Sequence, residues 1–332
     1  MKKFINKPEN VVEEMLEGIY LAHPAVTYAA NDKHCLVTAT PKPGKVGIAT
    51  GGGSGHLPLF LGYVGDGMLD GCAVGGIFQS PSAEQMLEVT KYIDQGAGVL
   101  YVYGNYTGDI INFDMAAELA EFEDIRVTSV VGNDDAASSV IGEEHKRRGV
   151  AGIFFVYKAA GAAAAEGLDL DEVTRIAEKA RLNTRTMGVA LSSCIVPEIG
   201  HPTFEIGETE MEIGMGIHGE PGISRRDLEP ADDVVDALME RLFAENLYES
   251  GDVAVLVNGL GGTPREELYI LYRRVAQRLS DRNIAAKHVF IGEYATAMEM
   301  AGASISLMKL DDELDRLIGA AANTPFFTRL KG

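Results

Sequence analysis

The chain has few cysteines, and its histidines are not arranged in metal-binding motifs. Of its 332 residues three are cysteines, Cys35, Cys72 and Cys194, and none belongs to a CxxC pair. We therefore expect ordinary buried thiols rather than a disulfide framework or a zinc site. No HxH, HxxH or HExxH spacing occurs among the histidines. Because a metal site needs partners at such spacings, the sequence predicts none.

Basic residues and long apolar runs are also scarce. There are 29 Lys and Arg against 49 Asp and Glu, which gives a formal charge of −20. Nucleic acid and anionic membrane surfaces require a basic face, so neither is an expected partner. No apolar run reaches the roughly 18 residues of a membrane span, and no apolar signal segment follows the basic start MKKFINKPEN. We expect a cytoplasmic protein.

Apolar, β-branched runs alternate with amphipathic helical stretches, which is typical of α/β proteins. The expected strands are 46–50, 98–103, 126–131, 152–157, 187–191, 253–258, 288–291 and 304–310. The expected helices are 9–21, 83–93, 114–121, 159–167, 171–181, 231–246 and 264–278. The polar stretch ARLNTRT at 180–186 marks a predicted boundary. We expect two α/β domains, residues 1–183 and 184–332, each with a mixed, largely parallel sheet flanked by helices.

A glycine-rich stretch, GIATGGGSGHLPLF, begins within the first expected strand and covers residues 47–60. It is not a P-loop, because no lysine follows Gly55, and it does not fit the GxGxxG dinucleotide fingerprint. Two interpretations remain open. Either the stretch is a tight turn in which His56 only caps the structure, or a ligand approaches the glycine backbone and meets His56 there.

Two further loops carry candidate reactive groups. GNYTGDIINF, residues 104–113, follows the strand expected at 98–103. In open α/β sheets ligands bind at the carboxyl ends of strands, so Asp109 is either a ligand-facing carboxylate or a helix cap or turn residue. His218 lies in GMGIHGEPGISRR, residues 214–226. The glycines around it leave its ring little covered by neighbouring side chains, which suits a reacting group better than a core histidine.

Taken together, GGGSGH, NYTGD and GIHGEPG resemble the DhaK subunit family of dihydroxyacetone kinases, and the resemblance extends over the whole chain. It implies a homodimer that binds a short-chain hydroxyketone, either dihydroxyacetone or a four- or five-carbon ketose, for phosphorylation. His218 would hold the ketone as a covalent hemiaminal, and His56 and Asp109 would act at the hydroxyl that receives the phosphate. The implied substrate contacts also include Gly53, Ser54, Gly55, Phe78, Ser80 and Gly104.

The same resemblance implies that this chain binds no cofactor or metal. ATP or ADP with magnesium is expected on a DhaL-like nucleotide-binding partner subunit, which a DhaM-like protein of the phosphotransferase system recharges in some members. The alternative is a non-catalytic paralogue that senses the hydroxyketone and passes the signal to a transcriptional regulator. Retention of both His56 and Asp109 favours the kinase.

The chemistry of the residues agrees with covalent capture, but two positions depart from the family pattern. A neutral imidazole adds to a ketone and not to an alcohol, so capture would select ketoses over polyols such as glycerol. Leu57 stands where the family usually has glutamate, and Gly104 stands where it usually has lysine. The missing lysine side chain predicts space beside the substrate for a ketose of four or more carbons.

Overall fold

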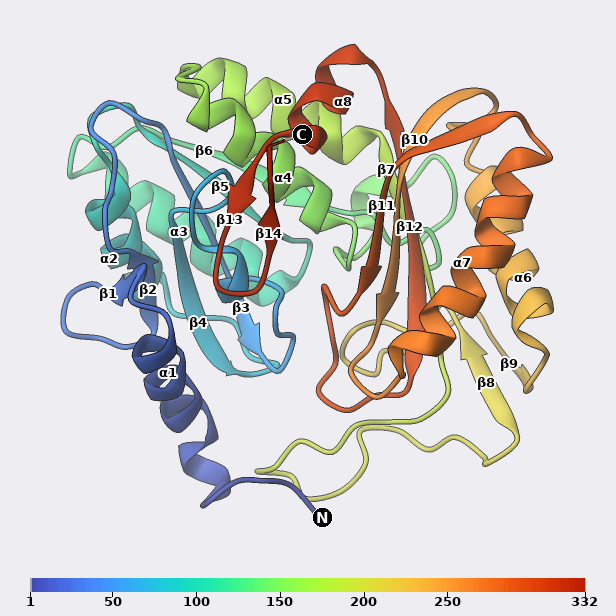
Figure 1. The fold of residues 1–332 in the computed structure, drawn as a ribbon. Helices are drawn as coiled ribbons and strands as arrows, with labels where there is room; N and C mark the ends of the chain where they lie inside the picture. Colours follow the sequence, from blue (N-terminus) through green and yellow to red (C-terminus); the bar gives the residue numbers. More distant parts are fainter. Residues whose placement is uncertain (1, 332) are drawn as a thin grey trace.

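The computed structural model describes residues 2–331, which contain two six-stranded mixed sheets flanked by helices (Figure 1). The strands of the first sheet are β1 (Val26–Tyr28), β2 (Cys35–Thr38), β3 (Gly47–Ser54), β4 (Gly71–Ile77), β5 (Val99–Gly104) and β6 (Val127–Gly132). Their order is β1-β2-β4-β3-β5-β6. The pairings among β4, β3, β5 and β6 are parallel, while β1 and β2 add antiparallel pairings at one edge. This sheet is mixed and largely parallel, as predicted.

The second sheet is mixed too, but most of its pairings are antiparallel, which corrects that part of the prediction. Its strands are β7 (Thr184–Ala190), β8 (Glu210–Ile213), β9 (Ser224–Asp227), β10 (Gly251–Gly259), β11 (Ile284–Gly292) and β12 (Gly302–Leu310), in the order β11-β10-β12-β7-β8-β9. β10 and β11 pair in parallel, and the other neighbours pair antiparallel. A parallel pair needs a crossover helix, which α7 (Arg265–Ser280) supplies between β10 and β11.

The remaining helices cover the faces of the two sheets. They are α1 (Val11–Ala22), α2 (Ala83–Ile93), α3 (Thr107–Glu121), α4 (Ile153–Ala165), α5 (Leu170–Leu182), α6 (Ala231–Phe243) and α8 (Asp312–Gly319). α2 packs on β2, β3 and β4, and α6 and α7 pack on the second sheet. In Figure 1, α4, α5 and α8 lie together at the top, between the two sheets.

Two expected elements differ from the structure. Residues 152–157, predicted as a strand, include the first turn of α4. Gly152–Tyr157 is continuously apolar, and a short apolar run cannot be assigned to a helix or a strand by its periodicity alone. α4 is a buried helix, because its residues from Ile153 to Ala164 are all buried. The second difference is that α3 starts at Thr107 instead of 114, so Asp109 lies in its first turn.

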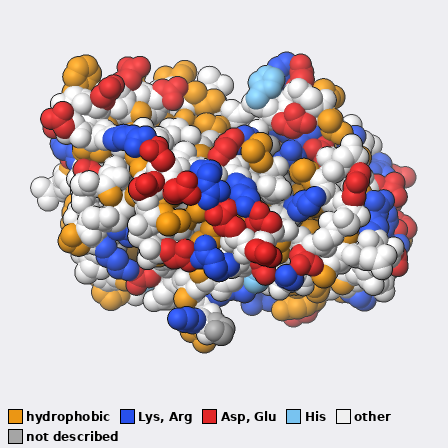
Figure 2. Space-filling model, turned by 90° about the horizontal axis from the view of Figure 1, so that it is seen from above, with side chains coloured by type: hydrophobic (Ala, Val, Ile, Leu, Met, Phe, Trp, Pro, Cys, Tyr) orange, Lys and Arg blue, Asp and Glu red, His pale blue; other side chains and the backbone are white. Residues whose placement is uncertain are grey.

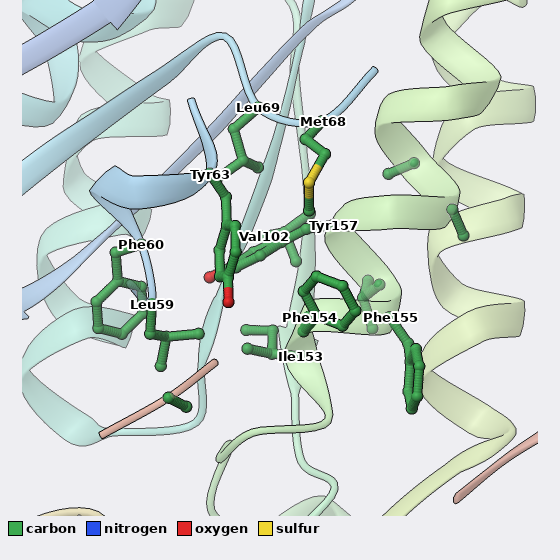
Figure 3. Close-up of a cluster of buried hydrophobic side chains, with 14 of the residues drawn as sticks. Leu59, Phe60, Tyr63, Met68, Leu69, Val102, Ile153, Phe154, Phe155 and Tyr157 are labelled. Atoms are coloured by element: carbon green, nitrogen blue, oxygen red, sulfur yellow. The ribbon is translucent and has the colours of Figure 1, made fainter. Parts of the chain in front are cut away.

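The main hydrophobic core lies around α4 and joins the two sheets. Figure 3 shows Phe154 and Tyr157 of α4 packed against Tyr63, Met68 and the segment that leads into β4. The same buried cluster continues into the second sheet through residues such as Phe290 and Met308, and into α8. The C-terminal hairpin of β13 (Ala322–Asn323) and β14 (Thr328–Arg329) also returns to the first sheet's side, where the Asn323 N–H donates to the Asp66 carbonyl. Because this core and the hairpin join both parts of the chain, the predicted domain boundary at residue 183 stays a prediction.

Charges of both signs alternate over the face seen in Figure 2. Ion pairs between α5 and α8 contribute to this pattern, with Arg175 and Lys179 each 2.7 Å from Glu313. Such exposed pairs contribute little to stability. Among residues 2–331, no helix combines the length and apolarity needed to span a membrane.

Gly161, inside α4, tests the close packing of this helix. A Cβ at this position would lie 2.3 Å from Met68 Cα and 2.4 Å from the Met68 carbonyl oxygen. Alanine normally favours a helix over glycine by about 1 kcal/mol, but overpacking a core costs roughly 1–3 kcal/mol. We expect Gly161→Ala to lower the free energy of unfolding, measured by urea denaturation. Gly18→Ala in α1 is the matched control, because apart from its chain neighbours and the backbone of its own helix no atom lies within 4 Å of the added Cβ, and it should stabilise the chain. If both variants stabilised the protein, the packing argument would be wrong.

Candidate functional site

Residues that are far apart in the sequence converge at the carboxyl ends of the parallel strands. His56 follows β3, Ser80 follows β4, and Asp109 follows β5, while His218 comes from the loop between β8 and β9 of the second sheet. Ser80, Asp109 and His218 line a cavity of about 220 Å³, and His56 packs against Phe78 and His218 of that lining. Its lining consists of Gly53, Phe60, Phe78, Gln79, Ser80, Tyr106, Gly108, Asp109, Ile217 and His218.

Two other hollows have fewer potentially reactive side chains in their linings. An apolar one of about 240 Å³ lies among α6, α7 and the ends of β7 and β12. A more open one of about 680 Å³ lies along residues 191–210 and Arg225. Neither lining brings a histidine together with a carboxylate. A further open hollow, of about 450 Å³, does combine His145 with Asp114 and Glu178. The cavity at His218 and Asp109 is the candidate site because its lining brings together residues of all three sequence motifs.

His56 is a buried, neutral histidine with a defined tautomer. Its Nδ1 lies 2.6 Å from the Thr296 carbonyl oxygen. Because a carbonyl only accepts, Nδ1 carries the proton and Nε2 holds a lone pair. That Nε2 is buried and has no hydrogen-bond partner within the described chain. Burial and the neighbouring charge of His218 lower the pKa of His56 to about 3, so its ring stays uncharged at neutral pH.

Aromatic rings fix the position of His56. Phe78 stacks on it with ring centroids 4.8 Å apart, and His218 meets it edge-on at 4.7 Å. Phe78 and Phe60 both have positive φ angles, +58° and +69°, which are costly for residues with a side chain. A Cβ at Gly53 would lie 2.7 Å from the backbone nitrogen of Gln79, so only glycine allows this close approach.

Asp109 is a buried carboxyl, not a helix cap. The N-cap position of α3 is Tyr106, and Asp109 is the third residue of the helix. Its side chain is buried, and its Oδ1 has no hydrogen-bond partner among residues 2–331. Burial raises its pKa to about 6, although a hydrogen bond with Ser80 and the charge of His218 act in the opposite direction. A carboxyl with a pKa near neutrality suits proton transfer.

His218 presents a free ring nitrogen because Glu220 holds the other one. Its Nδ1 lies 2.9 Å from Glu220 Oε1. Burial would raise the pKa of Glu220, but the hydrogen bond and charge of His218, together with the charge of Arg148, lower it to about 2. An ionised carboxylate only accepts, so Nδ1 donates the proton, and in the neutral ring Nε2 is the nitrogen with the lone pair. Sequence reasoning gave Glu220 no role, although it lies in the same GIHGEPG motif.

Four predicted contact residues lie outside the lining of the cavity, namely Ser54, Gly55, His56 and Gly104. Ser54 donates from its hydroxyl to the Gly75 carbonyl, and the Gly55 carbonyl accepts from the Met298 N–H. Gly104 shows a clear difference from expectation, because the space beside it is filled. A Cβ there would lie 3.0 Å from the ring of Tyr106, whose hydroxyl donates to the Gly149 carbonyl. The missing lysine therefore leaves no open space, and sequence reasoning missed Tyr106 as a wall of the cavity.

Comparison with known proteins identifies the family. The Dak1 domain family matches residues 17–326. The chain is 50% identical over 331 residues to the dihydroxyacetone-binding subunit DhaK of a PTS-dependent dihydroxyacetone kinase from Listeria innocua, and the match covers 98% of this chain and 99% of that protein. The chain belongs to the Dak1 family. It is also 42% identical over 331 residues to a D-erythrulose kinase of Mycolicibacterium smegmatis, covering 99% of this chain but 57% of that protein.

Solved structures of the family share the fold. The dihydroxyacetone kinase of C. freundii superposes with a TM-score of 0.89 at 32% identity, covering 99% of this chain. This chain spans 60% of that kinase chain. The dihydroxyacetone kinase operon co-activator Dha-DhaQ also gives a TM-score of 0.89, at 31% identity, with 96% of this chain and 98% of that chain covered. The Dak1 fold alone therefore does not separate a kinase subunit from a co-activator.

The contrast between Asp109 and an aspartate that is paired with arginines is measurable by carboxyl NMR. We expect Asp109 to take up a proton with a midpoint near pH 6, because burial raises its pKa to about 6. Asp236 serves as the internal control, because hydrogen bonding to Arg274 and Arg278 lowers its pKa to about 2. In the same titration the ring of His56 should stay neutral between about pH 5 and 8. An Asp109 midpoint near the ordinary value of about 3.9 would contradict the desolvated site.

Proposed function

We propose that this chain is the substrate-binding subunit of a ketose kinase, which captures a short-chain hydroxyketone on His218 and presents its terminal hydroxyl for phosphorylation. One observation carries the proposal. A single cavity combines a ring nitrogen held free as a nucleophile, on His218, with a buried carboxyl of raised pKa, on Asp109. The first suits addition to a carbonyl, and the second suits removal of a proton from a hydroxyl.

The capture step uses the tautomer that Glu220 imposes on His218. The Nε2 lone pair forms a bond to the carbonyl carbon, and the π electrons of the C=O bond move to its oxygen. That oxygen takes up a proton, and the ring gives up the proton on Nδ1, so the product is a neutral hemiaminal. While the ring is cationic, the Glu220 carboxylate 2.9 Å away stabilises its charge. Covalent capture also fixes the terminal hydroxyl, which lowers the entropic cost of phosphoryl transfer.

Asp109 and His56 contribute differently at that hydroxyl. With a pKa of about 6, Asp109 is mostly ionised at neutral pH and accepts the proton as the hydroxyl attacks phosphorus. His56, with a pKa of about 3, is a poor base, but its Nε2 lone pair accepts a hydrogen bond and orients the hydroxyl. In this proposal Asp109 is the base, and His56 is a hydrogen-bond acceptor that orients the hydroxyl.

The phosphoryl donor belongs to another chain in this proposal. The sequence contains no P-loop and carries an excess of acidic residues, which is unfavourable for gripping a nucleotide. The expected donor is ATP or ADP with magnesium on a DhaL-like subunit. The Listeria innocua relative is named as PTS-dependent, which favours ADP recharged by a DhaM-like protein. We propose a cytoplasmic homodimer as the working form.

The substrate proposed is a ketose of three or four carbons. The relatives named for dihydroxyacetone and for D-erythrulose fit this range. Since the ring of Tyr106 occupies the space beside Gly104, loss of the lysine does not lengthen the cavity, and the argument for a longer ketose loses its basis. Measuring kcat/KM for dihydroxyacetone and for both erythrulose enantiomers, with the partner subunit present, decides between the two lengths.

The second candidate is a hydroxyketone sensor, favoured by the match to the co-activator Dha-DhaQ. A sensor needs His218 for capture but has no use for a base at the terminal hydroxyl. The buried Asp109, which costs stability when ionised, supports the kinase instead. Phosphorylation of a captured ketose by the reconstituted subunits would exclude a purely sensory role.

Replacement of His218 tests capture directly. Incubation with dihydroxyacetone or erythrulose should add the mass of the ketose to the intact chain, and His218→Ala should abolish this adduct. His145→Ala is a suitable control, because this histidine lies outside the lining of the cavity. An adduct that survives His218→Ala would exclude His218 as the nucleophile.

Asp109 should set the acid limb of turnover. Asp109→Asn is expected to lower kcat roughly 10²–10⁴-fold, the range for a positioned base, while capture persists. In the wild type, kcat should fall as the pH drops through about 6, because the raised pKa of Asp109 makes it neutral there. His56→Asn should reduce kcat but leave this midpoint unchanged. If the acid limb of the kcat–pH profile shifted in His56→Asn but not in Asp109→Asn, the base would be His56 and not Asp109.

A further inference from the structure

A partly buried network of charged side chains is linked to His218 through Glu220. Arg148, from the loop before α4, is close to two carboxylates. Its Nε and Nη2 lie 2.9 and 2.8 Å from Asp135 Oδ2, and its Nη1 lies 3.8 Å from Glu220 Oε2. Glu220 in turn holds Nδ1 of His218. The chain of contacts Asp135, Arg148, Glu220 and His218 therefore runs from the first sheet's side to the nucleophile.

Several hydrogen bonds hold the backbone and the side chain of Arg148 in place. Its backbone N–H donates to the Ser138 hydroxyl, and its backbone carbonyl accepts from the Asp135 N–H. Nη2 also donates to the Gly214 carbonyl, in the loop that carries His218. The side chains of Arg148 and Asp135 are 15% and 4% exposed, so solvent screens their interaction only weakly.

The His218 loop is shaped around this guanidinium. A Cβ at Gly216 would lie 2.2 Å from Glu220 Oε2 and 2.6 Å from Arg148 Nη1. Only glycine leaves room for the two charged groups to approach each other at this point. The Gly216 N–H also donates to the Glu220 carbonyl, which closes the turn around His218.

We propose that Arg148, anchored by Asp135, is a positioning residue for the covalent capture step. It holds Glu220 where it keeps the Nδ1 proton of His218, and its positive charge opposes a second proton on that ring. Both effects keep Nε2 available as the nucleophile. The inference rests on the proposed function and adds to it a residue that touches neither the substrate nor the ring.

The charges around His218 give the sign of the expected pH effect. The carboxyls that face the ring are Glu220 on its own loop and Asp109 on α3, and the other charged or titratable groups near it are Arg148 and His56. The ring of Tyr106 also packs against His218 at 4.8 Å. Removing Arg148 leaves the carboxylates dominant, so capture should require a higher pH than in the wild type.

The test measures capture of [2-¹³C]dihydroxyacetone by NMR across pH, without any partner subunit. We expect Arg148→Gln to weaken capture at neutral pH roughly 10- to 100-fold, the scale for a misplaced reacting group, and to raise the pH midpoint of capture. Arg148→Lys keeps the charge and loses the forked geometry, so it should weaken capture with a smaller change in midpoint. Arg225→Gln is the matched control, since this arginine pairs with Glu212 on the same hairpin.

The outcomes separate this inference from the proposed function. If Arg148→Gln folds by circular dichroism and captures the ketose like Arg225→Gln, with the wild-type midpoint, Arg148 has no positioning role. If Arg148→Gln does not fold, Arg148→Lys and Asp135→Asn carry the test, and unchanged capture and midpoint in both would overturn the inference. Absence of a His218-dependent adduct in the wild type would instead refute the proposed function.

Discussion

The site depends on a short set of hydrogen bonds that joins the two sheets. The loop after β3 and the segment after β11 exchange several bonds over residues 55–57 and 296–298. The Met298 N–H donates to the Gly55 carbonyl, and Thr296 donates from its N–H and its hydroxyl to the carbonyls of His56 and Leu57. In return, Nδ1 of His56 donates to the Thr296 carbonyl. These bonds hold the two halves of the site together and also determine which nitrogen of His56 is free.

The balance between burial and neighbouring charge then decides the protonation of the carboxyls at the site. Asp109 lies in the first turn of α3, where the helix dipole favours a negative charge by about 0.3–1 kcal/mol. Burial outweighs this effect, because the pKa is nevertheless raised to about 6. Glu220 shows the opposite balance, since the charges of His218 and Arg148 outweigh its burial and lower its pKa to about 2. The two carboxyls near the His218 ring therefore differ in pKa, as the proposed roles of a proton acceptor and a fixed anion require.

The sequence predicted the groups of the site better than it predicted their surroundings. Continuous apolar runs located β3, β5 and β6, and the motifs after β3 and β5 placed His56 and Asp109 at one edge of the sheet, where the structure has them. Taking a continuous apolar run as a strand was wrong for residues 152–157, because a fully buried helix and a buried strand are both apolar on all sides. Neither the antiparallel pairing of the second sheet nor the ring of Tyr106 beside Gly104 follows from local patterns, since both depend on contacts between distant segments.

The glycines around His218 were interpreted from the sequence for an incomplete reason. Their number suggested a ring left uncovered, but the structure gives them a packing role. Gly216 admits Glu220 and Arg148, and a Cβ at Gly222 would lie 2.2 Å from the Ile213 carbonyl oxygen. The loop is therefore tightly packed behind the ring while Nε2 remains open in front. Because His218 comes from the second sheet and Asp109 from the first, the groups proposed for capture and for proton transfer are placed by separate elements. Two hydrogen bonds between the two sheets' loops fix their relative position. Arg148 donates to the Gly214 carbonyl, and His56 donates to the Thr296 carbonyl.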